Sequence, residues 1–254
     1  HSAEHWKLFA ELGWLAIPFS EELGGLEGNV VDLSLVFEEF GKSIIVEPYL
    51  ANVVLSGGVL KRGDLDQKSE FIESLISGNK QFSLANYEPN KGYNLDNVEC
   101  TISSDGIVSG RKTTVLNAPN ADYFIVFGKQ GSGYSFALVP KDAEGLEVVG
   151  YKTYDGFVSG DLHLENCKAD VVFSKSDALE ILHQAILEGI ICVSSEAIGA
   201  METCYKLTIE YTQQREQFGQ SLSKFQALQH RMVDMLSLIH ISEPTRLLSI
   251  SYAV

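Results

Sequence analysis

The chain has 254 residues, of which 45% are apolar, enough to form one large hydrophobic core or several smaller ones. Its 34 acidic and 19 basic residues give a formal net charge of −15, which repels a phosphate backbone and argues against nucleic-acid binding. No unbroken apolar run approaches the ~20 residues that a membrane-spanning helix requires, so no membrane span is expected.

The chain begins without a basic region or an apolar region of the kind found in signal peptides. We expect it to be a fragment that begins within a longer protein. The cysteines show neither a CxxC pair nor a Cys/His cluster of zinc-ligand spacing, and the six histidines form no close pair on one helical face. No metal site is expected. Reduced thiols in the cytoplasm are the simplest interpretation of four widely spaced cysteines: Cys100, Cys167, Cys192 and Cys204.

The first part of the chain, residues 1–80, is predicted to be an incomplete N-terminal helical domain. Its apolar residues recur at helical spacing. Asp32 is the predicted N-cap of a helix that Gly41 stops. A second helix, starting at about Asp66, is predicted to end at Gly78.

Residues 81–173 show a different pattern, in which short β-rich runs alternate with turn residues. The expected strands are 98–103, 113–116, 123–127, 134–139 and 160–164, with a turn at Asp105 and Gly106. Turn signals at this spacing predict a central β-barrel or sandwich.

A long helical pattern resumes after Ser174 and continues towards Tyr211. We interpret residues 174–235 as the first part of a C-terminal helical domain. The order of elements is therefore α, β, α, and the predicted fold class is α+β.

The last residues, 236–254, differ from the rest of the chain. The run from Leu236 to Arg246 interrupts the last predicted helix, and Pro244 cannot continue it. The same run results from translating a transposase-type sequencing-library adapter, and we hypothesise that 236–254 is an artefact. The alternative is a natural amphipathic tail. Resequencing the source DNA without that library chemistry decides between them, because recovery of the same codons would refute an artefact.

The most specific motif begins at Arg215 and reads R-x-x-F-G-x-x-L-x-x-F-Q. This spacing resembles the signature of the acyl-CoA dehydrogenase family, in which the arginine and the residue two beyond it reach the FAD pyrophosphate of a neighbouring subunit. The resemblance implies that role for Arg215 and Gln217, with Phe218 and Gln226 near the adenosine. Arginine suits this role because its forked donors make two parallel bonds to a phosphate. Without the surrounding match, Arg215 is equally well a surface residue at a helix end.

The resemblance covers nearly the whole chain before the tail and includes residues 16–25. It implies an acyl-CoA dehydrogenase-like fold with a helical N-terminal domain, a central β domain and a truncated C-terminal bundle. Within the family, the chain looks closest to the pimeloyl-CoA dehydrogenase small-subunit type, through residues 41–50, 154–156 and 196–202.

Two segments resemble the family's flavin-binding segments, with substitutions. The loop T-E-P-x-x-G-S-D corresponds to residues 87–94, and the segment G-x-K-x-W-I-T corresponds to residues 110–116. Thr114 stands where an aromatic residue would cover the flavin ring, and Leu116 where a hydroxyl would face it, which weakens the case for a complete ring pocket. A plain β-strand is the alternative interpretation of residues 113–116. The cofactor-binding residues that the resemblance implies here are Tyr87, Glu88, Gly92, Thr114, Val115 and Leu116.

The family's reaction needs a carboxylate that removes a proton alpha to a thioester while the flavin accepts the beta hydride. One family position for this base lies in the part of the C-terminal domain that the chain lacks. The other falls on Gly189 and Ile190. Glu188 is one residue away, a rotation of about 100° around a helix. Glu188 is therefore a candidate base, and a solvated or interface glutamate is the alternative.

Two functions follow from the resemblance. The first is an FAD-dependent acyl-CoA dehydrogenase subunit that desaturates an acyl-CoA in fatty-acid or organic-acid degradation. The second is a non-catalytic partner that lends Arg215 and Gln217 to a flavin held by another chain. Both imply an acyl-CoA substrate, a homo- or hetero-oligomer and an electron-transferring flavoprotein as acceptor. A flavin-free β-domain interaction protein leaves the motif at Arg215 unexplained.

Overall fold

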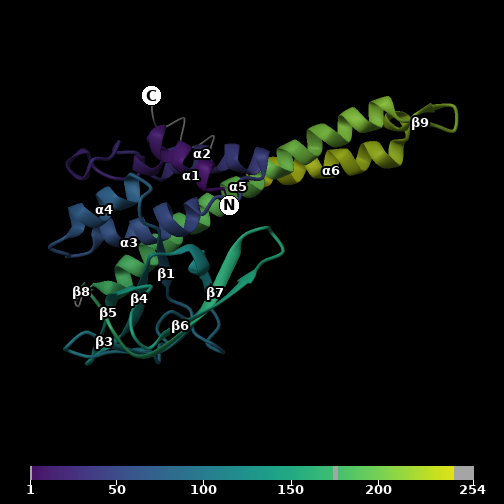
Figure 1. The fold of residues 1–254 in the computed structure, drawn as a ribbon. Coiled ribbons are helices and arrows are strands. Elements are labelled where there is room, and N and C mark those ends of the chain that lie inside the picture. Colours follow the sequence, from purple (N-terminus) through teal and green to yellow (C-terminus); the bar gives the residue numbers. More distant parts are fainter. Residues whose placement is uncertain (1, 174–176, 243–254) are drawn as a thin grey trace. The chain divides into compact units, whose positions relative to one another are not determined.

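A computed structural model describes residues 2–173 and 177–242 of the chain (Figure 1). The chain divides into two compact units. The first unit comprises His1–Val30 and Val46–Ile190, and the second comprises Val31–Ile45 and Ile191–Val254. The long helix α5, Ala178–Gln214, contributes its first residues to the first unit and the rest to the second.

Apart from the start of α5, the helices of the first unit are short, and residues 51–54 and 56–60 of η3 and α3 are buried. The side chain of Ser2 caps the first of them by accepting a hydrogen bond from the backbone N–H of His5, which satisfies a donor at the helix start. The helix predicted from about Asp66 begins at Lys68 and ends as expected before Gly78, whose φ is 72°. These short helices are α1 Ala3–Glu11, η1 Trp14–Ala16, η2 Glu21–Leu23, the π-helix η3 Leu50–Ser56, α3 Gly57–Arg62, α4 Lys68–Ile76 and η4 Ala118–Asn120.

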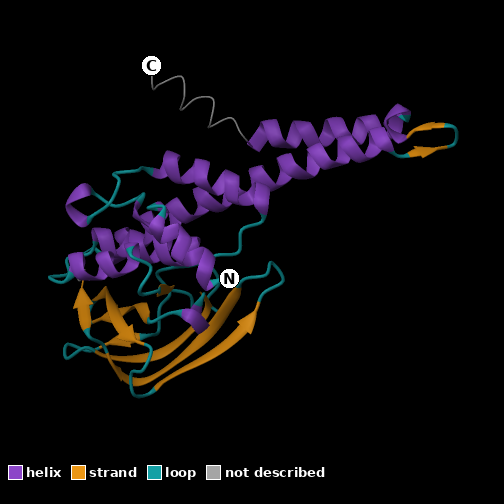
Figure 2. Cartoon of the chain, turned by 45° about the horizontal axis from the view of Figure 1, so that its top comes forward, coloured by secondary structure: helices purple, strands orange, loops and turns teal. Residues whose placement is uncertain are grey.

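The central part of the first unit is a curved eight-stranded sheet with the order β6-β7-β3-β2-β4-β5-β8 and with β1 beside β4 (Figure 2). The apolar residues of β4 and β5 form much of its core, because their middle residues are almost fully buried. The strands are β1 Phe82–Ala85, β2 Thr101–Ile102, β3 Ile107–Leu116, β4 Tyr123–Gln130, β5 Gly133–Pro140, β6 Leu146–Lys152, β7 Val158–Lys168 and β8 Val171–Phe173.

All five predicted strands overlap an observed strand, and the turn at Gly106 has the expected positive φ of 77°. The prediction missed β1, β6 and β8. Strand β1 has no alternation of apolar and polar residues because all four of its residues are buried. The predicted strand 98–103 is reduced to Thr101–Ile102.

In the second unit, α2, Val30–Ser43, lies against the later part of α5. A Cβ at Gly41 would stand 1.9 Å from the carbonyl oxygen of Glu196, and a Cβ at Gly199 would stand 1.9 Å from that of Glu38. The prediction that Gly41 stops the helix is therefore wrong. Gly41 lies within α2, where the absence of a side chain lets the two backbones approach closely. Asp32 is likewise not an N-cap, because it lies in the first turn.

The end of the second unit is a helical hairpin in which α6, Gln226–Ser242, runs back beside α5 (Figure 1). Between them lie β9 Glu216–Gln217, β10 Gln220–Ser221 and the 3-10 turn η5 Leu222–Lys224. The hydroxyl of Thr212 on α5 contacts Sδ of Met232 on α6 at 3.6 Å. The prediction that the run from Leu236 interrupts the helix is wrong for residues 236–242, because α6 continues to Ser242. Leucine and isoleucine tolerate a helix, and Pro244 lies beyond the described residues.

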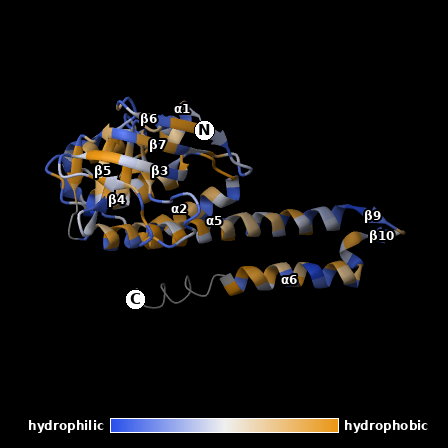
Figure 3. Cartoon of the chain, turned by 90° about the horizontal axis from the view of Figure 1, so that it is seen from below, coloured by the Kyte–Doolittle hydropathy of each residue, from blue (hydrophilic) through white to orange (hydrophobic). Residues whose placement is uncertain are grey.

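Helix α5 is also apolar along much of its 37 residues (Figure 3). By length and composition alone it is the one described helix that could cross a membrane. Unbroken apolar runs do not reveal a long helix that is apolar only on average, so this helix was not expected as a membrane-span candidate. Because core helices of soluble proteins share these properties, the absence of a membrane span stays a prediction.

Candidate functional site

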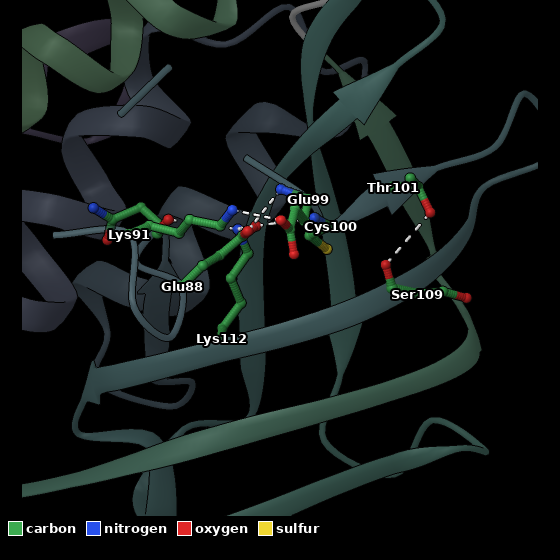
Figure 4. A network of polar contacts seen from close by, with 8 residues as sticks. Glu88, Lys91, Glu99, Cys100, Thr101, Ser109 and Lys112 are labelled. Carbon is green, nitrogen blue, oxygen red and sulfur yellow. Dashed lines mark hydrogen bonds and ion pairs between the residues drawn. The ribbon is translucent and has the colours of Figure 1, made fainter. Parts of the chain in front are cut away.

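The loop of the first predicted flavin segment is fixed by a buried ion pair between Glu88 and Lys112 (Figure 4). The Lys112 ammonium lies 2.8 Å from Oε1 of Glu88, and the two side chains are 0% and 4% exposed. The backbone N–H groups of Glu99 and Cys100 also donate to this carboxylate, at 2.6 and 3.0 Å. Glu88 therefore connects three parts of the chain: its own loop, β3 and the segment that leads into β2.

Burial by itself raises the pKa of Glu88, but Lys112 and the two backbone donors outweigh that effect and hold the pKa below its ordinary value. The carboxylate is therefore ionised at neutral pH. Burial raises the pKa of the neighbouring Cys100 to about 11, so this thiol stays protonated and unreactive. No group of three or more histidine, cysteine, aspartate or glutamate side chains that could hold a metal occurs in the described part of the chain.

The other residues of the first segment are more exposed than Glu88. The ring of Tyr87 is partly buried and meets the ring of Tyr93 edge-on, with 6.0 Å between the ring centres. Tyr93 is 90% exposed, which makes it available to a ligand. Gly92 has a φ of 61° in a loop where a side chain would meet no neighbour within 4 Å. The left-handed backbone therefore explains this glycine.

The second predicted flavin segment lies on β3 and contains a backbone irregularity. Lys112 pairs with Leu162 and Val115 pairs with Gly160, so Thr113 and Thr114 together face Asp161 on β7. The carboxylate of Asp161 accepts hydrogen bonds from the hydroxyl of Thr113 and the backbone N–H of Thr114. The side chain of Thr114 is exposed, that of Val115 is buried, and that of Leu116 is partly buried.

The residues of the dinucleotide motif lie in the second unit, at the turn between α5 and α6. Gln217 pairs with Gln220 in the short β9–β10 hairpin, and Phe218 is 91% exposed with a φ of 53°. Gln226 is exposed at the first position of α6. Arg215 is exposed, and no side-chain partner for its guanidinium is found in residues 2–173 and 177–242. An exposed forked cation and an exposed aromatic ring in the same turn are suited to a phosphate-bearing aromatic ligand.

The candidate base Glu188 is held by a basic pair from α3. The guanidinium of Arg62 donates to both of its carboxylate oxygens, at 2.5 and 3.2 Å, and the ammonium of Lys61 lies 3.8 Å away. A Cβ at the adjacent Gly189 would stand 2.8 Å from Cδ2 of Leu55 on the π-helix. The structure therefore places Glu188 in a polar cluster that accounts for the residue without catalysis. Its role as a base stays a prediction.

This arrangement gives one testable consequence. We expect Glu188→Gln to lower the free energy of unfolding by about 1 to 2 kcal/mol, because a partly buried ion pair is broken. We expect the rate of flavin reduction by an acyl-CoA to change less than tenfold. Urea unfolding and stopped-flow absorbance measure the two effects, with Glu180→Gln on the exposed start of α5 as the control. A loss of flavin reduction by a factor of about a thousand without a stability change would instead identify Glu188 as the base.

Sequence reasoning singled out the loop residues and missed the two charged residues that fix them, Lys112 and Asp161. Lys112 is part of the motif quoted from the sequence, but its neighbours Arg111 and Thr113 are polar, so nothing in the local sequence indicated that its charge is buried and paired. Asp161 gave no signal either, because only the pairing of β3 with β7 brings it opposite Thr113 and Thr114.

Comparison with known proteins gives consistent matches along the chain. The family models described as acyl-CoA dehydrogenase N-terminal, middle and C-terminal domains match residues 1–79, 75–167 and 179–245. L-prolyl-[peptidyl-carrier protein] dehydrogenase of a Serratia species is 29% identical over 262 residues, which cover 92% of this chain and 66% of that protein. A probable acyl-CoA dehydrogenase of Bacillus subtilis is 30% identical over 250 residues, which cover 91% of this chain and 65% of that protein.

Solved structures show the same fold. PigA with FAD and proline is 26% identical, with a TM-score of 0.86 over 94% of this chain and 67% of that one. Butyryl-CoA dehydrogenase from Megasphaera elsdenii, at 23% identity and a TM-score of 0.85 over 95% and 68%, supports the fold alone. The chain spans 66% and 65% of the lengths of the two curated relatives.

Proposed function

The chain belongs to the acyl-CoA dehydrogenase family, and we propose that it is a subunit of an FAD-dependent dehydrogenase that desaturates an acyl-CoA thioester between its alpha and beta carbons. The observation that carries the proposal is the exposed guanidinium of Arg215, which has no side-chain partner within the described part of the chain and belongs to the family's dinucleotide motif. The proposal includes an oligomeric assembly, an electron-transferring flavoprotein as electron acceptor and a cytoplasmic location. The finer placement beside the pimeloyl-CoA dehydrogenase small-subunit type and the domain boundaries stay predictions.

The residues present suit the binding of FAD in two places. Arg215 offers parallel donors to a pyrophosphate, and the amide of Gln217 and the ring of Phe218 lie beside it in the same hairpin. In the first unit, the Glu88–Lys112 pair and Asp161 hold the two segments that would bind the flavin ring. FAD, when bound, supplies the hydride acceptor. The chain's own residues bind and orient it.

A second candidate function is a non-catalytic partner subunit that completes the FAD site of another chain. Four observations favour it. Leu116 has no hydroxyl to direct at a flavin ring, and Thr114 provides no aromatic cover. Both oxygens of Glu188 are occupied by Arg62, and Gly189 has no side chain. A chain with this site could bind part of a flavin without supplying the base.

The first test is the flavin content of the chain purified alone and after co-expression with a candidate dehydrogenase partner. Stoichiometric FAD in the chain alone supports a self-sufficient dehydrogenase subunit, whereas FAD present only in the complex supports the partner function. Absence of FAD from both preparations would contradict both proposals.

Arg215 provides the sharper test of the site. We expect Arg215→Ala to weaken FAD binding by about ten- to a hundredfold, because charge-assisted bonds to a pyrophosphate are lost. Arg215→Lys should be intermediate, since lysine supplies a point charge without the forked geometry. Flavin fluorescence titration measures the affinity in whichever preparation holds FAD. The control is Arg231→Ala, which removes an exposed arginine from α6, outside the motif. Equal losses at both positions would indicate a general charge effect and contradict the assigned role.

A further inference from the structure

Strand β3 contains a strained backbone position at Thr114. Its φ is 54°, in the left-handed region, which β-branched residues rarely adopt. Strain of this kind persists only where the surrounding structure over-determines it, and it concentrates at functional positions. Thr114 lies in a β-bulge of β3, and its strained backbone therefore indicates that neighbouring residues hold the bulge and that the bulge has a function.

Asp161 accounts for the stability of the strained backbone at Thr114. At the bulge, two residues of β3 face one residue of β7, so the regular ladder of backbone hydrogen bonds is interrupted. Oδ1 of Asp161 accepts from the Thr114 backbone N–H at 3.0 Å and from the Thr113 hydroxyl at 2.8 Å. The hydroxyl of Tyr151 on β6 donates to the same oxygen at 3.2 Å. One carboxylate oxygen thus gathers three donors from two strands and satisfies the N–H that the ladder leaves unpaired.

The charge state of Asp161 is consistent with this role. Burial alone raises its pKa, but the donors from Thr114, Thr113 and Tyr151 and the nearby His163 outweigh burial and hold the pKa below its ordinary value. An ionised carboxylate accepts stronger hydrogen bonds than a neutral one. The bulge is therefore held by charge-assisted bonds at neutral pH.

The same bulge joins the two segments that would bind the flavin. The backbone N–H of Thr113 donates to the carbonyl oxygen of Tyr87 at 3.0 Å, and the adjacent Lys112 binds Glu88. A change in the backbone at 112–114 therefore alters both segments together. Gly160, which pairs with Val115 next to the bulge, has little room for a side chain, since a Cβ there would stand 3.1 Å from both Cβ of Ala118 and the carbonyl oxygen of Val149. The close packing at Gly160 further limits the conformations open to this part of the sheet.

We propose that Asp161 is a positioning residue for the cofactor: its carboxylate fixes the bulge at Thr113 and Thr114, and thereby keeps both flavin-binding segments in one conformation. This inference rests on the proposed function, because it assigns a purpose to the bulge that only a bound flavin would use. Asp161 does not itself need to touch the cofactor. Its contribution is to reduce the conformations that the two segments must give up on binding.

The experiment compares Asp161→Ala and Asp161→Asn with the wild-type chain, in the preparation that holds FAD. Hydrogen–deuterium exchange monitors the backbone of residues 112–116, and flavin fluorescence titration measures FAD affinity. We expect Asp161→Ala to accelerate exchange of the Thr114 amide and to weaken FAD binding, each on the order of tenfold or more. The exchange rate and the FAD affinity of Asp161→Asn should lie between those of the wild type and of Asp161→Ala, because asparagine retains an acceptor oxygen without the charge. The asparagine variant also serves if the alanine variant fails to fold.

The matched control is Asp155→Ala. Asp155 also accepts bonds from a threonine hydroxyl and a backbone N–H, those of Thr153 and Phe157, within its own turn and away from β3. The Asp155→Ala substitution should leave both the exchange rate of residues 112–116 and the FAD affinity near their wild-type values. Faster exchange throughout the sheet in Asp161→Ala, instead of at 112–116 alone, would show a general structural role and overturn the proposal.

The outcomes separate this inference from the proposed function. Wild-type FAD binding together with unchanged affinity in Asp161→Ala would overturn the role of Asp161 and leave the proposed function intact. Absence of FAD from the wild-type chain and from its complexes would overturn the proposed function and, with it, the purpose assigned to the bulge.

Discussion

Replacing Lys112 with methionine is expected to lower the free energy of unfolding by about 3 to 5 kcal/mol, because it leaves the Glu88 carboxylate buried without its cation. The pair is almost completely shielded, with side-chain exposures of 0% and 4%. The backbone donors of Glu99 and Cys100 remain in the variant and offset only part of the loss. Urea unfolding followed by circular dichroism measures the change.

Lys91→Met is the matched control in the same network (Figure 4). Lys91 pairs with Glu99, whose side chain is 75% exposed, so solvent screens this pair and its loss should cost about 1 kcal/mol or less. Adding Glu88→Gln to Lys112→Met should recover part of the lost stability, since the uncompensated charge is removed. Similar losses for Lys91→Met and Lys112→Met would contradict the special role of the buried pair.

The same pair has a defined pH dependence. Because the folded-state pKa of Glu88 lies below its ordinary value, its stabilising contribution is present above the ordinary value and is lost as the pH falls through the folded-state pKa. In Lys112→Met the carboxylate lacks its cation and takes up a proton at higher pH. The stability difference between wild type and variant should therefore narrow as the pH falls from the pKa of Glu88 in the variant to its lower pKa in the wild type.

The order of helical and β-rich regions could be predicted from periodicity, because it depends on patterns that extend over ten or more residues. Positions set by a single distant contact could not. Gly41 has the local signature of a helix stop, yet it is required by the backbone of Glu196, more than a hundred residues later. Asp161 is an ordinary polar strand residue until the register of β3 and β7 brings it opposite Thr114. Local propensity has no information on such pairings.

The candidate site also contains some residues that could be predicted from the local sequence and others that could not. Arg215 and Gln217 could be proposed from the sequence because their motif is contiguous, and the hairpin that exposes Gln217 is local. The state of Glu188 was not predictable, because its partner Arg62 lies on another helix. The geometry around Glu188 favours a structural residue, and its distance in sequence from Arg62 explains why the spacing argument alone left both interpretations open.

The second large effect is expected at the crossing of α2 and α5. We expect Gly199→Ala to lower the free energy of unfolding by about 3 kcal/mol, and Gly41→Ala by a similar amount, because the added methyl groups would each stand 1.9 Å from a carbonyl oxygen. The two oxygens belong to backbone, so no rotation of a side chain relieves the clash. The helices must separate, which weakens the contact between Lys42 on α2 and Glu202 on α5.

Helix propensity acts in the opposite direction and makes this prediction discriminating. Alanine stabilises a helix interior by about 1 kcal/mol relative to glycine, so a variant without the clash would gain stability. Gly58→Ala in α3 provides the control, since its methyl group would lie 3.4 Å from Cβ of Ala185, an ordinary contact distance. Unfolding midpoints in urea should therefore fall for Gly199→Ala and stay level or rise for Gly58→Ala. A rise for Gly199→Ala would mean that α2 and α5 do not approach each other this closely, because propensity alone would then determine the result.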